Sequence, residues 1–157
     1  MSTRHSDAAS ALATVADSLT VTLDGVSVSV AGGAWDAAEV RRHIADAPAL
    51  VLACLRLDDY TRRGNDAWRA RADLAAYVIT RDMPAGADRH SQALTLSGRL
   101  MEVVSGTNWG RPQAFDIPEL ASVRAHNLYS GSLDSVAVAL WAVTWRQALH
   151  FSGGSHA

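Results

Sequence analysis

The sequence contains no lysine and only one cysteine. All 14 basic residues of the 157-residue chain are arginines, and 16 acidic residues bring the formal net charge to −2. A balance this even gives no sign of a general nucleic-acid or acidic-lipid binder. Without lysine, the chain cannot carry the phosphate-binding loop of P-loop NTPases. Cys54 has no partner for an internal disulfide, which is compatible with a reducing compartment.

Long apolar runs are absent as well. The longest, residues 136–143, falls far short of the ~18–20 apolar residues that cross a bilayer. The first ten residues, MSTRHSDAAS, lack the apolar centre of a signal peptide. We therefore expect no membrane span, and we expect the protein to be made and kept in a cytoplasm.

The sequence shows no motif that would hold a metal ion or a cofactor. Its six histidines have no HxH, HxxxH or HExxH spacing, and Cys54 belongs to no CxxC pair. The glycines of AGGAW and GTNWG lack the strand and helix context of dinucleotide- or phosphate-binding loops. We therefore expect no metal and no cofactor, and a structural role for each histidine.

Hydrophobic patterns indicate which elements the chain forms. Leu12, Val15 and Leu19 recur at helical spacing, which predicts a short helix with Asp7 as its N-cap. Strict alternation on both sides of Asp24-Gly25 predicts a β-hairpin over residues 19–30. The later elements are a short helix (35–48), a strand buried on both faces (49–57), a charged loop (58–70), a second central strand (70–82), the longest helix (88–105), and two antiparallel strands (120–130 and 134–149) joined by a turn at 130–133.

This order predicts an α+β fold with a single domain. We expect a mainly antiparallel (mixed) sheet of about four core strands with one long helix packed on it, plus the N-terminal short helix and β-hairpin. The domain covers residues 7–150, with flexible ends at residues 1–6 and 151–157.

Two groups of residues invite a catalytic interpretation. One group would supply the parts of a small serine hydrolase: His126, Ser130, Ser132 and Asp134. Neither serine sits in a GxSxG elbow, and Ser-Gly-Ser-Leu-Asp is common turn chemistry. The other group is the carboxylate pair Asp58-Asp59, but adjacent loop residues point apart, which favours solvated charge. We therefore expect no enzyme, with the hydrolase kept as an alternative.

One dense basic stretch contains an aromatic residue. Arg62, Arg63, Arg69 and Arg71 lie around Trp68, as in a nucleic-acid-binding patch. Nearby aspartates offset the charge, so a mixed-charge rim or a contact with another protein is the better interpretation. Five tryptophans in a small chain also suit a protein interface, although tryptophan is good core material too.

The last third of the chain carries the most distinctive pattern. HNLYSGSLDSVAVALWAVTWRQ, residues 126–147, resembles the C-terminal signature of a small tail-assembly protein family encoded by Mu-type bacteriophages and prophages. In that family an Asn-Leu-Tyr-Ser-Gly turn precedes a strand that ends in a Thr-Trp-x-Gln-like sequence. The matching residues are Asn127, Leu128, Tyr129, Ser130, Gly131, Trp141, Thr144, Trp145 and Gln147.

The resemblance extends upstream to about residue 34. PALVLACL is similar to the first core strand of the family, and ADLAAYVITRD is similar to its second. ALTLSGRLMEVVSGTNWG, a helix that closes on Asn108-Trp109-Gly110, is similar to the third element. The segment around Asp24-Gly25 lies outside the resemblance.

The resemblance implies a tail terminator, also called a tail completion protein. Such proteins have a compact α+β fold and form a hexameric ring on the finished tail tube. The ring stops tube polymerisation, caps the sheath in contractile tails and presents a surface to the head–tail connector. The implied partners are further copies of the chain, the tail tube protein, the sheath protein and the connector or stopper protein, all within the tail or neck of a virion assembled in the host cytoplasm.

The same resemblance implies neither covalent chemistry nor specific nucleic-acid binding, although DNA would pass through the ring. A head–tail connector or stopper protein of the neck is the alternative within the virion. A ring subunit makes heterologous contacts around a closed rotation axis, and exposed strand edges suit such contacts.

Both faces of the last predicted strand are apolar, so both must be covered. We expect the long helix to cover one face, Trp145 to lie near a subunit boundary, and Trp141 to belong to the fold. The candidate interface residues are Asn127, Leu128, Tyr129, Ser130, Gly131, Trp141, Trp145, Arg146, Trp68, Arg62 and Arg63.

Overall fold

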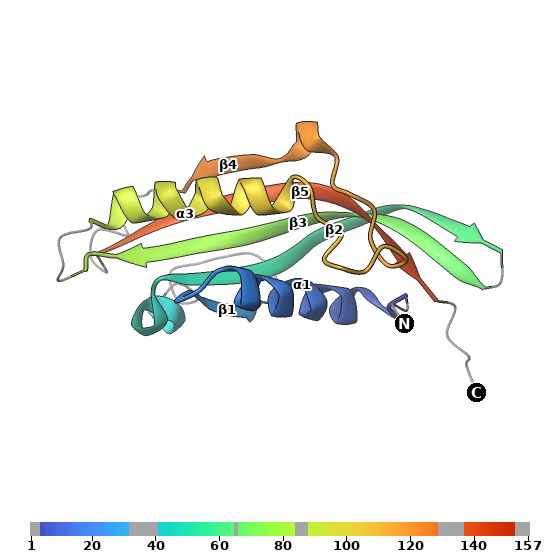
Figure 1. Cartoon of the computed structure of the whole chain (residues 1–157), viewed down its shortest axis with the longest axis horizontal. Helices are drawn as coiled ribbons and strands as arrows, with labels where there is room; N and C mark the ends of the chain where they lie inside the picture. Colours follow the sequence, from blue (N-terminus) through green and yellow to red (C-terminus); the bar gives the residue numbers. More distant parts are fainter. Residues whose placement is uncertain (1–3, 32–40, 65, 84–87, 129–136, 153–157) are drawn as a thin grey trace.

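Three long antiparallel strands form the centre of the protein (Figure 1). The structure is a computed structural model that describes residues 4–31, 41–64, 66–83, 88–128 and 137–152. Its elements are α1 (Ala8–Thr22), β1 (Ser27–Val30), η1 (Ile44–Asp46), β2 (Ala49–Arg63), β3 (Ala67–Arg81), α3 (Arg89–Val104), η2 (Leu120–Ser122), β4 (Arg124–Asn127) and β5 (Val138–Phe151). The strands lie in the order β1-β2-β3-β5-β4. β1 pairs parallel with β2, and every other pairing is antiparallel.

The predicted α+β fold is confirmed, as a single domain with a mixed sheet of five strands. The predicted long helix is α3, which begins after Asp88 as expected. The two strands predicted to be central are β2 and β3, and β5 is a third. Residues 49–53 of β2 and most of β5 are buried, which confirms that both faces of the sheet are covered in this region.

Alternation along the strands divides the buried side chains between two cores. Leu74 and Val78 of β3 lie on the face that both helices cover, while Tyr77 and Ile79 lie on the other. The expectation that one long helix covers the sheet is therefore incomplete, because α1 packs on the same face as α3. The buried helix residues of this core are Ala11, Leu12, Val15, Ala16 and Leu19 of α1, and Leu96, Leu100 and Val104 of α3.

The predicted hairpin at Asp24-Gly25 is wrong. α1 continues to Thr22, so the first predicted strand is helical, and β1 pairs with β2 instead. Burial explains the difference: Leu19 and Leu23 are 0% and 1% exposed, and both pack against the sheet. Tertiary contacts of this kind override local alternation. The threonines of the segment fit the helix because each hydroxyl donates to the carbonyl four residues earlier, at 2.8 Å.

The predicted charged loop over residues 58–70 is also wrong. β2 runs to Arg63 and β3 begins at Ala67, so a tight turn joins two long strands. This part of the hairpin lies largely in solvent, so many of its side chains are polar. The sequence therefore lacks the hydrophobic pattern by which a buried strand is predicted. It extends past the ends of both helices (Figure 1). Two register shifts, after Cys54 and after Asp58, further interrupt the alternation.

The boundaries of the last elements differ from the prediction. Residues 120–122 form η2, so β4 starts only at Arg124 and its strand is shorter than predicted. β4 and β5 are antiparallel as expected, while the predicted turn at residues 130–133 lies outside the described residues. Phe151 ends β5 and is 4% exposed, so the ordered chain passes the predicted limit at residue 150.

The N-terminal end is more tightly held than predicted. Residues 1–6 were expected to be flexible, yet the backbone of His5 forms a β-bridge with Phe151. The Nε2 atom of His5 lies 2.6 Å from the Thr14 hydroxyl, and its ring meets the Phe115 ring edge-on at 5.4 Å. These contacts fasten the start of the chain to the end of the sheet.

Aspartate side chains cap both long helices. Asp7 Oδ1 accepts from the Ser10 N–H at 2.8 Å, which confirms the predicted cap. Asp88 Oδ1 accepts from the Ser91 N–H at 2.7 Å. These hydrogen bonds hold the pKa of both carboxyl groups below the ordinary aspartate value.

We expect acid to weaken the protein partly through these caps. Because each folded pKa lies below the unfolded pKa of about 3.9, the caps contribute stability above that value. The contribution is lost as the pH falls through the folded pKa values. An Asp7→Asn/Asp88→Asn variant keeps a capping acceptor at both sites but loses the titration. Its urea midpoint should therefore fall less steeply with acid than that of the unaltered protein, and parallel curves would contradict this.

Candidate functional site

The sheet face opposite the helices is apolar at one end and charged at the other. At the apolar end, Val51, Ile79 and Leu140 are buried, with Ala31 and Ile44 packed against them. Towards the β2–β3 turn, the same alternation places ionisable side chains on this face. The set defines the charged face: Arg56, Asp58, Asp59, Arg69, Arg71, Asp73, Arg146 and His150 from the strands, with Asp116 and Glu119 from the connection before β4.

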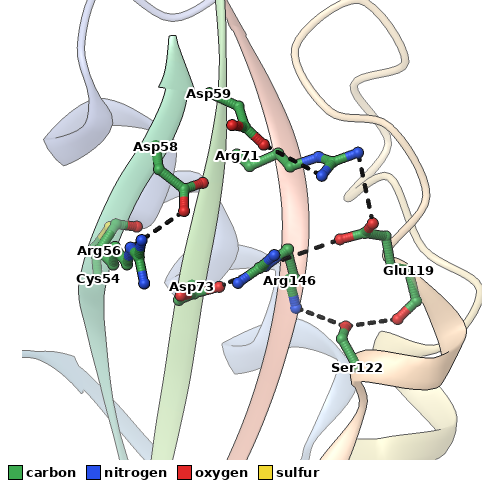
Figure 2. Close-up of polar contacts among 9 residues, drawn as sticks. All are labelled: Cys54, Arg56, Asp58, Asp59, Arg71, Asp73, Glu119, Ser122 and Arg146. Atoms are coloured by element: carbon green, nitrogen blue, oxygen red, sulfur yellow. Dashed lines mark hydrogen bonds and ion pairs between the residues drawn. The ribbon is translucent and has the colours of Figure 1, made fainter.

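Arg146 stands at the centre of the charged face (Figure 2). Its Nε donates to Asp73 Oδ1 at 2.9 Å and lies 3.9 Å from Glu119 Oε2. Its backbone N–H donates to Ser122 Oγ at 2.8 Å. The hydrogen bond that Arg146 donates to the Asp73 carboxylate raises the pKa of Arg146 above its ordinary value. β3, β5 and η2 are thereby joined at one residue.

Glu119 links Arg146 to a second arginine. Its other oxygen lies 3.7 Å from Arg71 Nη2, and Arg71 Nη1 donates to Asp59 Oδ2 at 3.2 Å (Figure 2). Nearby, Arg56 Nε pairs with Asp58 at 3.1 Å. Side chains of these pairs are partly to largely solvent-exposed, so they add little to stability. Their fixed pattern of both signs suits recognition of a complementary surface.

The remaining acid of the charged face is also paired. Asp116 Oδ1 lies 2.9 Å from His150 Nε2, and its Oδ2 lies 3.5 Å from Arg69 Nη2. Every carboxylate of the charged face therefore faces an arginine or a histidine. Such groups are occupied by ion pairs rather than poised as a general base.

A shallow groove of about 550 Å³ crosses the charged face from β2 to η2 and β4. Arg124 at its rim has no ion pair in the part of the chain that the structure describes, so its charge is available to a partner. No three His, Cys, Asp or Glu side chains among the described residues come together to hold a metal ion. The lining includes Leu55, Asp73, Glu119, Ser122, Arg124 and Arg146.

A buried glutamine holds the other side of β5. Gln147 is 0% exposed, and its Oε1 accepts from the indole N–H groups of Trp109 and Trp145 at 3.0 and 3.1 Å. Its Nε2 donates to the carbonyls of Thr107 and Asp116 at 3.1 and 2.7 Å. All four hydrogen-bonding positions of the amide are thus used. We call this arrangement the Gln147 clamp.

The clamp depends on a tight turn at residues 107–110. Trp109 and Gly110 both have positive φ, at 59° and 71°. Thr107 Oγ1 accepts from the Trp109 N–H at 2.8 Å, and Asn108 Oδ1 accepts from the Gly110 N–H at 3.1 Å. These local bonds stabilise a backbone that few residues adopt, and the turn aims the Trp109 indole at Gln147.

The structure corrects the expected roles of the two tryptophans of β5. Trp145, expected near a subunit boundary, is 2% exposed and packs against Trp109 with ring centroids 6.2 Å apart. Trp141 is only partly buried at the edge of the same core. Trp145 therefore belongs to the core of a single subunit, because the connection after α3 covers it.

The candidate residues of the basic stretch lie at the tip of the β2–β3 hairpin. The Arg62 guanidinium lies 5.5 Å from the centre of the Trp68 ring and pairs with Asp66 at 3.1 Å. Tyr60, 57% exposed, packs on Trp68 at 4.9 Å between ring centroids. Arg63 beside them is exposed. With Arg69 and Arg71 also paired to carboxylates, the expected mixed-charge surface is confirmed.

The residues considered for hydrolysis are only partly described. His126 on β4 is exposed, and its Nε2 lies 3.5 Å from the Thr144 hydroxyl. Tyr129, Ser130, Gly131, Ser132 and Asp134 lie outside the described residues, whereas Asn127 and Leu128 are exposed beside β5. Cys54 is no activated nucleophile, because burial raises the pKa of its thiol.

Several residues of the charged face were not among the site residues predicted from the sequence. Glu119 and Asp116 stand in an irregular connection, where no pattern places a side chain. The alternation of Arg69, Arg71 and Asp73 is a usable signal, since residues two apart share one face of a strand. The loop predicted over residues 58–70 includes Arg69, whereas Arg71 and Asp73 belong to the strand predicted over residues 70–82.

Comparison with known proteins yields no family for this chain. No protein-family model matches the sequence, and no curated protein sequence matches it either. No helix among the described residues has the length and apolar character that a bilayer span requires.

Proposed function

We propose that the protein is a structural component of a bacteriophage-type tail. In this role it is a tail terminator whose copies form a ring that caps the tail tube, stops its polymerisation and joins the tail to the head connector. In a contractile tail the ring would cap the sheath as well.

One observation carries the proposal. Two segments of the resemblance, Asn108-Trp109-Gly110 and the end of the final motif from Thr144 to Gln147, meet in the Gln147 clamp. They lie far apart in sequence, yet each supplies an indole to the same amide. The residues that carry the resemblance thus form one structural unit, and this is the support that the structure gives to the proposal.

The surface suits assembly. The charged face has its acids and bases already matched within the subunit, so it supports complementary contact with another protein. The β2–β3 hairpin projects from the body and carries Tyr60, Arg62 and Trp68, residue types that are frequent in protein interfaces (Figure 1).

The proposal is tested by deleting the gene from its phage or prophage. A missing terminator should leave tail tubes of uncontrolled length, and restoring the gene should return a uniform length in electron micrographs. Tails of normal length that fail to join heads would instead identify a stopper. Normal particles would contradict both roles.

A double variant separates a role in assembly from a role in catalysis. His126→Ala/Ser132→Ala should leave tail length unchanged if the protein is structural. Hydrolysis lost in this variant, together with normal tails in the deletion strain, would favour the hydrolase. Steeply salt-dependent binding to DNA would favour the nucleic-acid alternative.

A further inference from the structure

Among the described residues, the sheet ends without a further strand on two sides, the side of β1 and β2 and the side of β4. β1 covers β2 only along residues 49–52, so among the described residues no strand pairs with the outer side of β2 beyond that point. On the far side, β4 pairs with β5, and no strand of the described chain lies beyond it. Free edges offer backbone N–H and C=O groups to another strand. We call these the β2 edge (residues 53–63) and the β4 edge (residues 116–128).

Exposed apolar side chains gather at these edges. Nine large hydrophobic residues among the described ones are exposed, and six of them belong to the two edges. The other three are scattered over α1, β1 and α3. The six are Leu55, Leu57 and Tyr60 at the β2 edge, and Ile117, Leu120 and Leu128 at the β4 edge. Each edge thus carries three exposed large apolar side chains that a neighbouring molecule could cover.

We propose that the β2 edge of one copy binds the β4 edge of the next copy, so that neighbouring sheets join into one. This inference rests on the proposed ring, and it names the surfaces that build the ring. The two edges differ, so the contact is heterologous, and it closes into a ring when the rotation between copies divides a full turn.

Strand direction favours this pairing. β3 is antiparallel to both β2 and β5, so β2 and β5 run the same way. β4 is antiparallel to β5 and therefore to β2. β4 lies level with residues 50–53 of β2, and β1 covers residues 49–52, so β4 meets the β2 edge when neighbouring copies are offset along the strands. Copies in the same orientation then present antiparallel strands to one another, the pairing that is slightly the more stable per residue.

The β2 edge is also matched in length to β4. Register shifts after Cys54 and after Asp58 divide the edge and leave two short regular stretches, at residues 56–58 and 61–63. β4 has four residues. Bulges hinder the addition of a long strand, so this edge favours a short strand and is protected from open-ended aggregation.

The first test places a charge on the β2 edge. Leu57→Lys alters a side chain that is 44% exposed, so the subunit should keep its urea midpoint. Leu94→Lys on α3, 59% exposed and outside the residues that define both edges, is the matched control. In sedimentation velocity we expect a closed oligomer for the unaltered protein and for Leu94→Lys, and monomer for Leu57→Lys.

The second test joins the edges covalently. In a Cys54→Ser background, Leu57→Cys and Ala125→Cys are combined in one chain. β3 and β5 lie between these positions, a separation of about 14 Å at the usual strand spacing, beyond the reach of a disulfide within a subunit. Oxidation should give a ladder of linked copies, whereas each single variant should stop at a dimer. A short bismaleimide cross-linker is used in parallel, so that the two cysteines are also joined when the strands pair in an offset register.

The outcomes separate this inference from the proposed function. If the Leu57→Lys protein still forms a ring and oxidation of the double-cysteine variant gives no ladder, the edge contact is wrong. The proposed terminator function is then unaffected. An unaltered protein that stays monomeric at every concentration would overturn the edge contact and also the ring.

Discussion

Gln147→Leu is expected to lower the free energy of unfolding by ~3–5 kcal/mol. Leucine fills a similar volume, so the loss comes from hydrogen bonding. The change leaves two indole N–H groups, from Trp109 and Trp145, without their acceptor inside the core. It also removes the donor to the carbonyls of Thr107 and Asp116. Unpaired polar groups in such surroundings retain the full cost of leaving water.

Urea unfolding followed by tryptophan fluorescence measures this effect. Gln113→Leu is the control, because Gln113 is exposed and its replacement should change stability by less than ~0.5 kcal/mol. Trp109→Phe removes one donor and keeps a ring in place, so the cost of the lost hydrogen bond is about 1 kcal/mol. A Gln147→Leu protein as stable as the control would show that the clamp contributes nothing.

Trp145→Ala should also destabilise the subunit by ~3–5 kcal/mol, the usual cost of removing a buried aromatic ring. The side chain is 2% exposed and packs on Trp109. Its loss leaves a cavity in the core beneath the connection after α3 and removes one donor to Gln147. A loss of this size is a large fraction of the free energy of unfolding, because small domains are only marginally stable.

Trp141→Ala is the matched comparison on the same strand. Trp141 is only partly buried, so its removal should cost clearly less than that of Trp145. Denaturation midpoints of the two variants, compared at equal protein concentration, decide the order. A larger loss for Trp141 would contradict the burial seen here and restore the original assignment of Trp145 to a surface contact.

Much of the fold follows from the sequence where burial and local pattern agree. α3 has an apolar stripe and a capping aspartate, and both signals indicate the same helix. The apolar alternation of β3 from Leu74 to Ile79 correctly divides its side chains between two cores. In these segments the local preference and the tertiary environment favour one structure.

The predictions from sequence fail where contacts between residues far apart in the chain determine the structure. Residues 19–22 alternate like a strand, but contacts of Leu19 with the sheet make them helical. Three of the four partners of Gln147 lie 31 to 40 residues earlier in the chain, so no local pattern marks its role. Glu119 joins the charged face only because its backbone N–H donates to the Arg146 carbonyl. Such positions require the folded structure.

The position of β5 also has a consequence for how the protein folds as it is synthesised. β5 is a central strand, yet it comes after the other four in the chain. Until residue 151 has left the ribosome, β3 has only one neighbour, and the apolar residues that face β5 remain uncovered. Pairing β5 with β3 closes a long loop, which is slow. The nascent chain therefore passes through a stage prone to aggregation, and the rate at which β5 docks should limit the yield of folded subunit.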